Sequence, residues 1–363
     1  MGGGRTVRTG AHRRVRRRGP PALAPRGIEV GCGVSAKIFV IGAGAWGTAL
    51  AQAARLAGND VVLVGRDPAA IDEINSAHTL KAYLGDIALD SGLKAQTGVS
   101  GLEDADAILM VVPAQATRAT LADIGADALA GKPVILCAKG LETVTNDRQS
   151  QILGELAPNA EPFVLSGPSF AHDVAAGKPT AVTLAGPTIE RAEAIAALLA
   201  SDSFRPYASG DIVGVEMCGA LKNVYALGAG AIEGAGLGLS ARSAFLARAY
   251  AELGRMIAAM GGSEATLSGL AGIGDLALSC TSSQSRNYRF GVALGQGRSV
   301  KDIEASGMGL AEGLFTTPVA KAVADRDGID APLVSAVDLL ISGQVRIEAI
   351  VPMLMRRPLK REE

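Results

Sequence analysis

The chain has 363 residues, of which 48% are hydrophobic, with 35 Lys and Arg against 36 Asp and Glu. This length suggests two domains, and the apolar content is sufficient for a packed core, which excludes an intrinsically disordered chain. Residues 1–36 contain eight Arg and one Glu (net +7), whereas residues 37–363 contain 27 basic and 35 acidic residues (net −8). An acidic body argues against nucleic-acid binding, which requires a basic surface.

Cysteine, histidine and hydropathy exclude further classes. The four cysteines, Cys32, Cys137, Cys218 and Cys280, form no CxxC pair. We therefore expect reduced thiols and a cytoplasmic protein rather than a disulfide scaffold. Three scattered histidines are too few for a metal cluster, so we expect no metal site. The longest uncharged run has 17 residues and contains three glycines, so we expect no membrane insertion.

The first 36 residues are mainly Gly, Arg and Pro. No apolar core follows Arg18, which argues against a signal peptide. The segment is rich in Arg and poor in acids, as transit peptides are, but it is also poor in Ser. We expect a basic disordered tail over 1–36, or a wrongly assigned start of the chain. The alternatives are a targeting segment and a segment that binds nucleic acid or anionic lipid.

Residues 37–41 predict a buried strand, followed by a glycine turn, a helix over 48–56 and a second strand over 60–64. Further strands are predicted at 107–112, 133–137, 163–165 and 181–184. Helices are predicted between them, among others at 117–129 and 189–199. Short apolar strands that alternate with helices predict a parallel sheet covered on both faces, which is an α/β, doubly wound architecture.

From residue 215 onward the periodicity is helical, with a core-facing apolar stripe over 242–260. We expect the domain boundary near 205–215. The predicted domains are a Rossmann-type domain over 37–212 and a helical substrate and catalytic domain over 213–350, followed by a tail over 351–363.

The glycine turn has the pattern Gly42-x-Gly44-x-x-Gly47 between a strand and a helix. The first glycine permits the tight turn, the second lets a pyrophosphate approach the backbone, and the third lets helix and strand pack closely. The free N–H groups at the start of the helix bind the phosphates. The pattern therefore predicts a site for NAD or NADP.

The second strand is followed by Arg66 and Asp67. An acid at this place accepts a hydrogen bond from the NAD ribose, and an Arg holds the 2′-phosphate of NADP. Arg66 comes first after the strand, which mildly favours NADP and leaves NAD open. The alternative is a solvated surface arginine.

Lys222 lies in an apolar helical stretch with no acid four residues away on either side. Loss of hydration lowers the pKa of a lysine toward the range used in proton transfer. The alternative is a lysine that extends to the surface or pairs with a remote acid. The adjacent Asn223 is able to hydrogen-bond a substrate oxygen.

Arg286 lies in a polar cluster over 281–287, which suits a bound phosphate or carboxylate, although an ordinary polar loop has the same composition. Lys139 follows a predicted strand end, where ligands of parallel sheets bind. Asp275 lies next to glycines and is also a candidate helix cap. Glu312 is either a site residue or a surface acid.

Several segments in fixed order resemble one family. They are GAGAWGTALA (42–51), VVLVGRDP (61–68), AKGLE (138–142), LSGPSFA (165–171), ALKNV (220–224), GIGDL (272–276), QSRN (284–287) and AEG (311–313). With them the chain resembles bacterial-type NAD(P)-dependent glycerol-3-phosphate dehydrogenase over about residues 37–345. The tail lies outside the resemblance.

The resemblance implies a Rossmann-type domain followed by an all-helical domain like the C-terminal domain of 6-phosphogluconate dehydrogenase. It implies an oxidoreductase that interconverts dihydroxyacetone phosphate and sn-glycerol 3-phosphate with NADP or NAD, for phospholipid synthesis. Lys222 matches the proton donor and acceptor. Substrate-contacting positions match Lys139, Gly167, Ser169, Lys222, Asp275, Ser285, Arg286 and Asn287. Cofactor-contacting positions match Ala45, Trp46, Arg66, Lys139, Ala171, Arg286, Leu310 and Glu312, beside the three glycines of the turn.

The chain departs from the family at Trp46, where relatives often carry Tyr or Phe, and at Ser169, where they often carry Thr. Both residues retain the physical role. The match at Leu310 is the loosest. A homodimer is expected for this helical domain. The alternatives are a related two-domain dehydrogenase acting on β-hydroxy acids or ketopantoate, and a non-catalytic NAD(P)-binding sensor.

Overall fold

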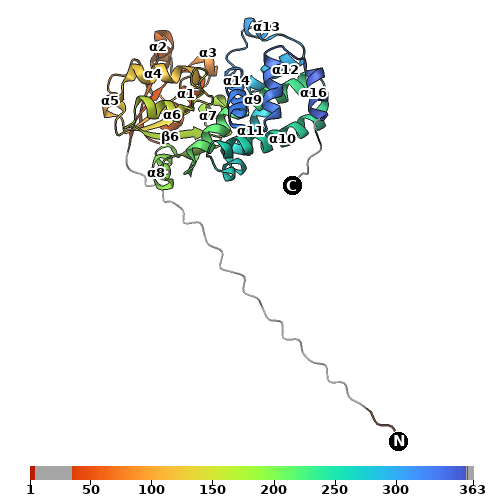
Figure 1. Cartoon of the computed structure of the whole chain (residues 1–363). Helices are drawn as coiled ribbons and strands as arrows, with labels where there is room; N and C mark the ends of the chain where they lie inside the picture. The colour runs from red at the N-terminus through yellow and green to blue at the C-terminus, as the bar shows by residue number, and fades with distance from the viewer. Residues whose placement is uncertain (5–34, 357, 359–363) are drawn as a thin grey trace. The chain divides into compact units, whose positions relative to one another are not determined.

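The computed structural model describes residues 1–4, 35–356 and 358 (Figure 1). The predicted basic tail therefore lies almost entirely outside the described residues. In the described part of the chain, eight strands form one sheet in the order β3-β2-β1-β4-β5-β6-β7-β8. Their bounds are β1 Lys37–Ile41, β2 Asp60–Gly65, β3 Lys94–Thr97, β4 Ala107–Met110, β5 Pro133–Leu136, β6 Glu161–Ser166, β7 Thr180–Ala185 and β8 Phe204–Ser209.

The sheet is covered on both faces by helices. Successive residues of β1 belong to opposite cores. Ile38 and Val40 pack with helices α1 and α8, and Phe39 and Ile41 pack with α4 and α6. This burial on both sides explains the continuous apolar strands. The helices are α1 Ala45–Leu56, α2 Pro68–Ala77, α3 Lys81–Leu84, α4 Thr117–Ile124, α5 Ala126–Leu129, α6 Gln149–Leu156, α7 Ala171–Ala175 and α8 Ile189–Leu199, with short 3₁₀ turns at Leu102–Asp104 (η1) and Ala114–Ala116 (η2).

The chain order reverses at β1, because β2 and β3 lie on one side of it and β4 to β6 on the other. Strands β1 to β6 all run parallel to one another. Such a reversal creates a crevice at the carboxyl ends of the strands, where open α/β sheets bind their ligands. The glycine turn that begins at Gly42 leaves β1 at this place.

The sheet differs from the prediction in three respects. Strands β3 and β8 were not predicted, because both lie at the sheet edges and have mixed polar sequences. Strand β7 is antiparallel to β6, so the sheet is not wholly parallel. The helix predicted over 117–129 is broken into α4 and α5 at Gly125, which has φ +85°. The prediction of a Rossmann-type domain followed by a helical domain is confirmed.

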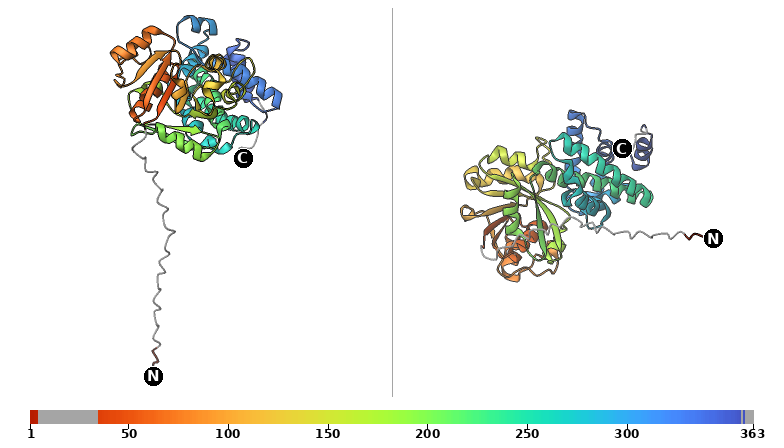
Figure 2. Two further views of the ribbon diagram at one scale, coloured as in Figure 1. Left: turned by 90° about the vertical axis from the view of Figure 1, so that its left-hand side faces the viewer. Right: turned by 90° about the horizontal axis from the view of Figure 1, so that it is seen from below.

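The C-terminal part is helical in the described residues (Figure 2). Its elements are α9 Ile212–Gly234, α10 Gly238–Ala259, a 3₁₀ turn Glu264–Ser268 (η3), a π-helical turn Leu270–Gly274 (η4), α11 Asp275–Thr281, α12 Arg286–Gly295, α13 Val300–Ala305, α14 Gly313–Asp327, α15 Pro332–Ile341 and α16 Ile347–Met355. Helix α9 is buried along most of its length. Residues 351–355, expected in a tail, instead complete α16.

Helices α9 and α12 meet backbone to backbone. A Cβ atom on Gly230 or Gly234 of α9 would lie 2.1 or 2.0 Å from a carbonyl oxygen of α12. A Cβ atom on Gly291 or Gly295 of α12 would lie 2.1 Å from a carbonyl oxygen of α9. The spacing of four residues places each glycine pair on one helix face. Only glycine permits this approach, which fixes the start of α12 relative to the middle of α9.

Among the described residues, no helix is both long enough and apolar enough to cross a lipid bilayer.

Candidate active site

The glycine turn forms a cradle at the end of β1. Gly42 has φ +120°, and a Cβ on it would lie 2.6 Å from the carbonyl oxygen of Val111. A Cβ on Gly47 would lie 1.7 Å from the carbonyl oxygen of Gly42. In contrast, a Cβ on Gly44 would meet no atom within 4 Å. The first and third glycines are thus required by packing, and the second faces open space.

The N-terminus of α1 fits an anion. Gly44 is the N-cap and provides no side chain, and the first turn holds no acid. The first N–H groups of a helix lack partners within the helix and attract negative charge. The indole Nε1 of Trp46, in this turn, is buried and has no hydrogen-bond partner among the described residues. The open space at Gly44 and the backbone N–H groups of the first turn of α1 fit the pyrophosphate of a dinucleotide.

The end of β2 distinguishes Arg66 from Asp67. The Oδ1 atom of Asp67 accepts a hydrogen bond from the N–H of Ala69 at 3.0 Å, so Asp67 caps α2. Arg66 is exposed. A Cβ on Gly65, the last residue of β2, would lie 2.6 Å from the Cβ of Ala43, so an acid does not fit there. Asp67 is exposed as well, but it serves as the cap of α2, whereas the guanidinium of Arg66 has no such role.

Three charged side chains meet where the sheet and the helical part join. Lys222 on α9 donates from Nζ to Oδ1 of Asp275 at 2.5 Å and to Oγ of Ser279 at 2.8 Å. Lys139, in the loop after β5, donates to Oδ2 of Asp275 at 2.7 Å and to the carbonyl oxygen of Gly167 at 3.0 Å. Asp275 is fully buried and so bridges two lysines.

Burial lowers the pKa of Lys222 to about 8, with Asp275 acting to raise it and the charge of Lys139 to lower it. Burial raises the pKa of Asp275, but the charges of Lys139 and Lys222 outweigh this effect and hold it below its ordinary value. Asp275 is therefore a permanent carboxylate at neutral pH, and Lys222 can both donate and accept a proton near that pH.

The backbone before α11 delivers Asp275 to this place. The π-helical turn η4 contains Gly272, whose φ and ψ of −80° and −106° are not helical. A Cβ on Gly272 would lie 2.2 Å from the carbonyl oxygen of Leu267. Asp275 then opens α11, so the helix dipole also favours its negative charge.

The predicted anion-binding segment opens α12. Ser285 is the N-cap, and its Oγ accepts from the N–H of Tyr288 at 3.3 Å. Arg286 is the first helical residue, is exposed, and forms no hydrogen bond or ion pair with any residue that the structure describes. Asn287 is buried, with its side chain bound to Asn223 and to the N–H of Gly313. Arg286 thus offers a free guanidinium beside a helix N-terminus.

Further candidates line the ends of β6 and α14. Gly167 has φ +147°, and its carbonyl oxygen accepts from both Lys139 and Ser169. Ala171 begins α7, and Leu310 is exposed.

Glu312 precedes α14 and is partly buried, and its Oε2 has no hydrogen-bond partner among the described residues. Burial raises its pKa, against the opposing effects of the N–H of Ala114 and the charge of Arg286. That Oε2 lies 3.1 Å from where a Cβ on Gly140 would stand, so Glu312 packs over the loop that holds Lys139.

The structure therefore joins Lys139, Gly167, Ser169, Lys222 and Asp275 in one hydrogen-bonded group. Asn287 is linked to this group through Asn223, which donates to the carbonyl oxygen of Lys139. The structure places the glycine turn, Arg66, Leu310 and Glu312 outside that group. Ser279, which accepts from Lys222, was not predicted from the sequence. Ser279 follows Asp275 by four residues, so the two side chains lie on the same face of a helix, and this spacing could have indicated Ser279 from the sequence.

Comparison with known proteins gives the family. The model of the NAD-dependent glycerol-3-phosphate dehydrogenase N-terminus matches residues 37–192, and that of the C-terminus matches residues 211–352. The chain belongs to the NAD-dependent glycerol-3-phosphate dehydrogenase family.

Among the members of this family, glycerol-3-phosphate dehydrogenase [NAD(P)+] of Caulobacter vibrioides is 44% identical over 326 residues, covering 90% of this chain and 98% of that protein. The Brucella ovis protein of the same name is 44% identical over 331 residues, covering 91% and 100%. The crystal structure of glycerol-3-phosphate dehydrogenase from Coxiella burnetii has 34% identity and a TM-score of 0.83, covering 89% and 99%. The family assignment thus extends over both domains of the chain.

Proposed function

We propose that the chain catalyses the reversible reduction of dihydroxyacetone phosphate to sn-glycerol 3-phosphate with NADPH or NADH. Family membership makes it an NAD(P)-dependent oxidoreductase acting on a secondary alcohol. The observation that carries the residue-level proposal is the buried Lys222, with a pKa of about 8, on the helix that packs directly against the one opening at Arg286.

Lys222 is the proposed proton donor and acceptor. When bound, the reduced nicotinamide supplies the hydride to the C2 ketone. Protonated Lys222 hydrogen-bonds the ketone oxygen, stabilises the negative charge that develops on it and transfers a proton to it. In the reverse direction, neutral Lys222 removes the proton from the hydroxyl group. Asp275 and Ser279 orient the Nζ atom through their hydrogen bonds to it.

The substrate phosphate is assigned to the start of α12. Arg286 is a fixed cation, and Ser285 and Asn287 flank it at the helix N-terminus. Anchoring energy from the phosphate positions the ketone at Lys222, so anchor and acid are separate groups on adjacent helices. Lys139, Gly167 and Ser169, which are joined through the carbonyl oxygen of Gly167, are proposed to complete this substrate site.

The cofactor is assigned to the carboxyl ends of the strands. Gly44 and the first turn of α1, which includes Ala45 and Trp46, would hold the pyrophosphate. Arg66 takes the 2′-phosphate, because Asp67 is occupied as a helix cap and Gly65 leaves no room for an acid. NADP is therefore the proposed preferred cofactor. Ala171, Leu310 and Glu312 are proposed to complete the nicotinamide end, together with Lys139 and Arg286.

A direct test follows nicotinamide absorbance with dihydroxyacetone phosphate, using NADPH and NADH in parallel. We expect rapid oxidation of the cofactor, faster at limiting concentration with NADPH. Dihydroxyacetone without phosphate serves as the control and should be a poor substrate. No oxidation by a folded chain that binds the cofactor would reject this substrate. β-Hydroxy acids and ketopantoate would then be tested, and binding without any turnover would favour a sensor.

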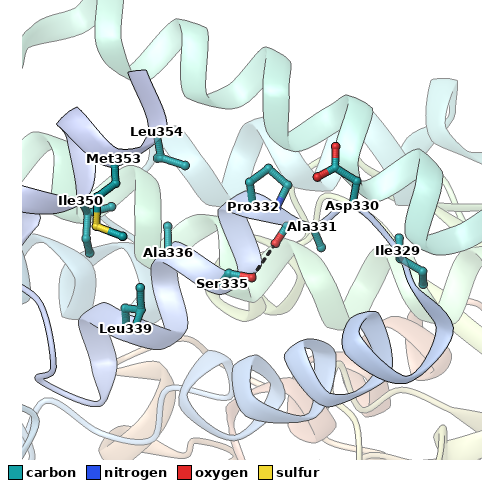
Figure 3. A pocket seen from close by; sticks show the side chains of 10 residues that line it. All are labelled: Ile329, Asp330, Ala331, Pro332, Ser335, Ala336, Leu339, Ile350, Met353 and Leu354. Atoms are coloured by element: carbon teal, nitrogen blue, oxygen red, sulfur yellow. Dashed lines mark hydrogen bonds between the residues drawn. The ribbon is translucent and has the colours of Figure 1, made fainter. Parts of the chain in front are cut away.

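A homodimer is proposed from the apolar surface of α16. Met353 and Met355 are exposed to 54% and 79%. A cavity of about 330 Å³ lies between α15 and α16, and its lining is mostly apolar (Figure 3). Exposed apolar surface of this kind marks interaction sites. Light scattering on the chain and on Met353→Glu tests the proposal, since a dimer through α16 should dissociate in the variant.

The boundary between the proposed domains is placed at residue 212, because β8 ends at Ser209 and α9 begins at Ile212. The cytoplasm is the proposed location, since the free thiols of Cys137, Cys218 and Cys280 are buried and suit a reducing compartment. In this setting the product would serve as a backbone for phospholipid synthesis.

A further inference from the structure

Two buried asparagines connect four parts of the proposed active site. The Nδ2 atom of Asn223 donates to the carbonyl oxygen of Lys139 at 2.8 Å. The Nδ2 atom of Asn287 donates to Oδ1 of Asn223 at 2.9 Å, and Oδ1 of Asn287 accepts from the N–H of Gly313 at 2.9 Å. We propose that Asn223 and Asn287 form one hydrogen-bond relay that holds Lys139 at Asp275, which makes Asn223 a positioning residue.

The orientation of both amides is dictated by the ends of the relay. Gly313 contributes a backbone N–H, which only donates, and Lys139 contributes a carbonyl oxygen, which only accepts. Both ends are satisfied only when each asparagine turns its Nδ2 atom toward the Lys139 end of the relay and its Oδ1 atom toward the Gly313 end. Asn223 and Asn287 are 6% and 8% exposed, so solvent does not replace a lost partner easily.

The relay continues the close contact of α9 and α12. Asn287 lies one turn before Gly291, and Asn223 lies one turn before Leu227, whose carbonyl oxygen faces Gly291. The contact between Asn223 and Asn287 therefore extends the contact of α9 with α12 by one helical turn, toward Lys139 and Lys222. A Cβ on Gly313 would lie 2.7 Å from the carbonyl oxygen of Asn223, so the relay closes only with glycine there.

The loop that carries Lys139 is held by side-chain amides, which donate to three consecutive backbone carbonyl oxygens. Asn223 binds the carbonyl oxygen of Lys139, Gln149 binds that of Gly140 at 3.0 Å, and Gln115 binds that of Leu141 at 2.7 Å. The Asn223 bond differs from the other two because it acts on Lys139 itself and crosses to the helical domain.

Displacing Lys139 has a specific electrostatic consequence. The charged and titratable groups that act on Lys222 are Asp275 on α11 and Lys139 in the loop. The thiol of Cys280 on α11 is neutral, since burial raises its pKa to about 12. The positive charge of Lys139 lowers the pKa of Lys222. A loosened Lys139 repels protonated Lys222 less, so the pKa of Lys222 rises.

Hydrogen exchange tests the relay without cofactor or substrate. We expect Asn287→Ala to raise amide exchange in residues 138–143 as much as Asn223→Ala does, although Asn287 forms no described hydrogen bond with that segment. The double variant should add little to either single variant. Gln115→Ala is the matched control, because its effect on the segment should add to that of Asn223→Ala. Unchanged exchange in Asn287→Ala would overturn the relay.

Kinetics provide the second readout and rest on the proposed function. Each single variant should lower kcat roughly tenfold, and the double variant by a similar factor rather than roughly 100-fold. The midpoint of the pH profile of ketone reduction should move to higher pH in all three variants and stay unchanged in Gln115→Ala. Multiplicative losses with an unmoved midpoint would contradict the proposal.

The two proposals fail separately. If the chain does not reduce the ketone but shows the coupled exchange pattern, the relay stands and the substrate is wrong. If it reduces the ketone and the exchange effects are independent, the relay is wrong. Should Asn287→Ala not fold, Asn287→Asp retains the acceptor for Gly313 and removes the donor to Asn223, and the same coupling is expected.

Discussion

The pH dependence of ketone reduction follows from the pKa of about 8 at Lys222. In the proposed mechanism, reduction requires protonated Lys222. With that pKa, the protonated fraction falls from roughly 90% at pH 7 to roughly 10% at pH 9. We therefore expect kcat for reduction to fall roughly tenfold over this range, equivalent to about 1.4 kcal/mol in the barrier. In the proposed mechanism, oxidation of glycerol 3-phosphate requires neutral Lys222. The kcat for oxidation should therefore rise between pH 7 and pH 9.

The assay measures kcat at saturating cofactor and ketone at each pH, with deuterated cofactor to establish that hydride transfer limits the rate. Asp275→Asn is the informative variant. It removes the negative charge that favours protonated Lys222, so the midpoint should move below that of the unaltered chain, and kcat at pH 7 should fall. Circular dichroism checks that the variant is folded.

Lys222→Met keeps the apolar stem and removes the titrating group. It should lose roughly 10²- to 10⁴-fold in kcat and show no midpoint in this range. A flat profile between pH 7 and 9 in the unaltered chain, with an isotope effect showing that chemistry is rate-limiting, would refute the assignment of Lys222. A midpoint that moves upward in Asp275→Asn would refute the electrostatic reasoning.

Three further substitutions test other parts of the site. Arg286→Ala should raise KM for the phosphorylated ketone roughly 10- to 100-fold, and a change confined to cofactor affinity would make Arg286 a cofactor residue alone. Arg66→Ala should weaken NADPH about tenfold or more and leave NADH unchanged, measured by quenching of Trp46, the one tryptophan of the chain. Gly291→Ala should destabilise the chain by about 1–3 kcal/mol in thermal unfolding, because its Cβ would meet the carbonyl oxygen of Leu227 at 2.1 Å. It should also raise KM for the ketone, because the helix contact positions Arg286 at the start of α12. Unaltered kinetics in the destabilised variant would contradict this role of the helix contact.

The parts of the molecule that depend on local sequence were predictable. The glycine turn needs only a strand, three glycines and a helix in succession, and the structure has all of them. The apolar surroundings of Lys222 were visible because α9 is buried on all sides, so neighbouring positions are apolar whichever way they face.

Contacts between distant segments were not predictable from the residues alone. The partner of Lys222 is Asp275, which is 53 positions away and reaches it only through the irregular turn at Gly272. The sequence alone did not show whether Arg66 or Asp67 is the candidate for the cofactor ribose, because it did not show that Asp67 caps α2. The antiparallel β7 was also hidden, because a six-residue apolar strand reads the same in either direction.

The backbone contact of α9 with α12 fixes the spacing of the two helices that carry the proposed acid and the proposed phosphate anchor. The proposed acid and the proposed anchor, Lys222 and Arg286, start from two helices that touch through glycines, so the separation of their backbones does not depend on how core side chains pack. We therefore expect a substrate with a longer carbon chain between ketone and phosphate to fit less well between Lys222 and Arg286. Sliding one helix along the other would take these four glycines away from the carbonyl oxygens that they face, and this loss of close contact opposes such a movement.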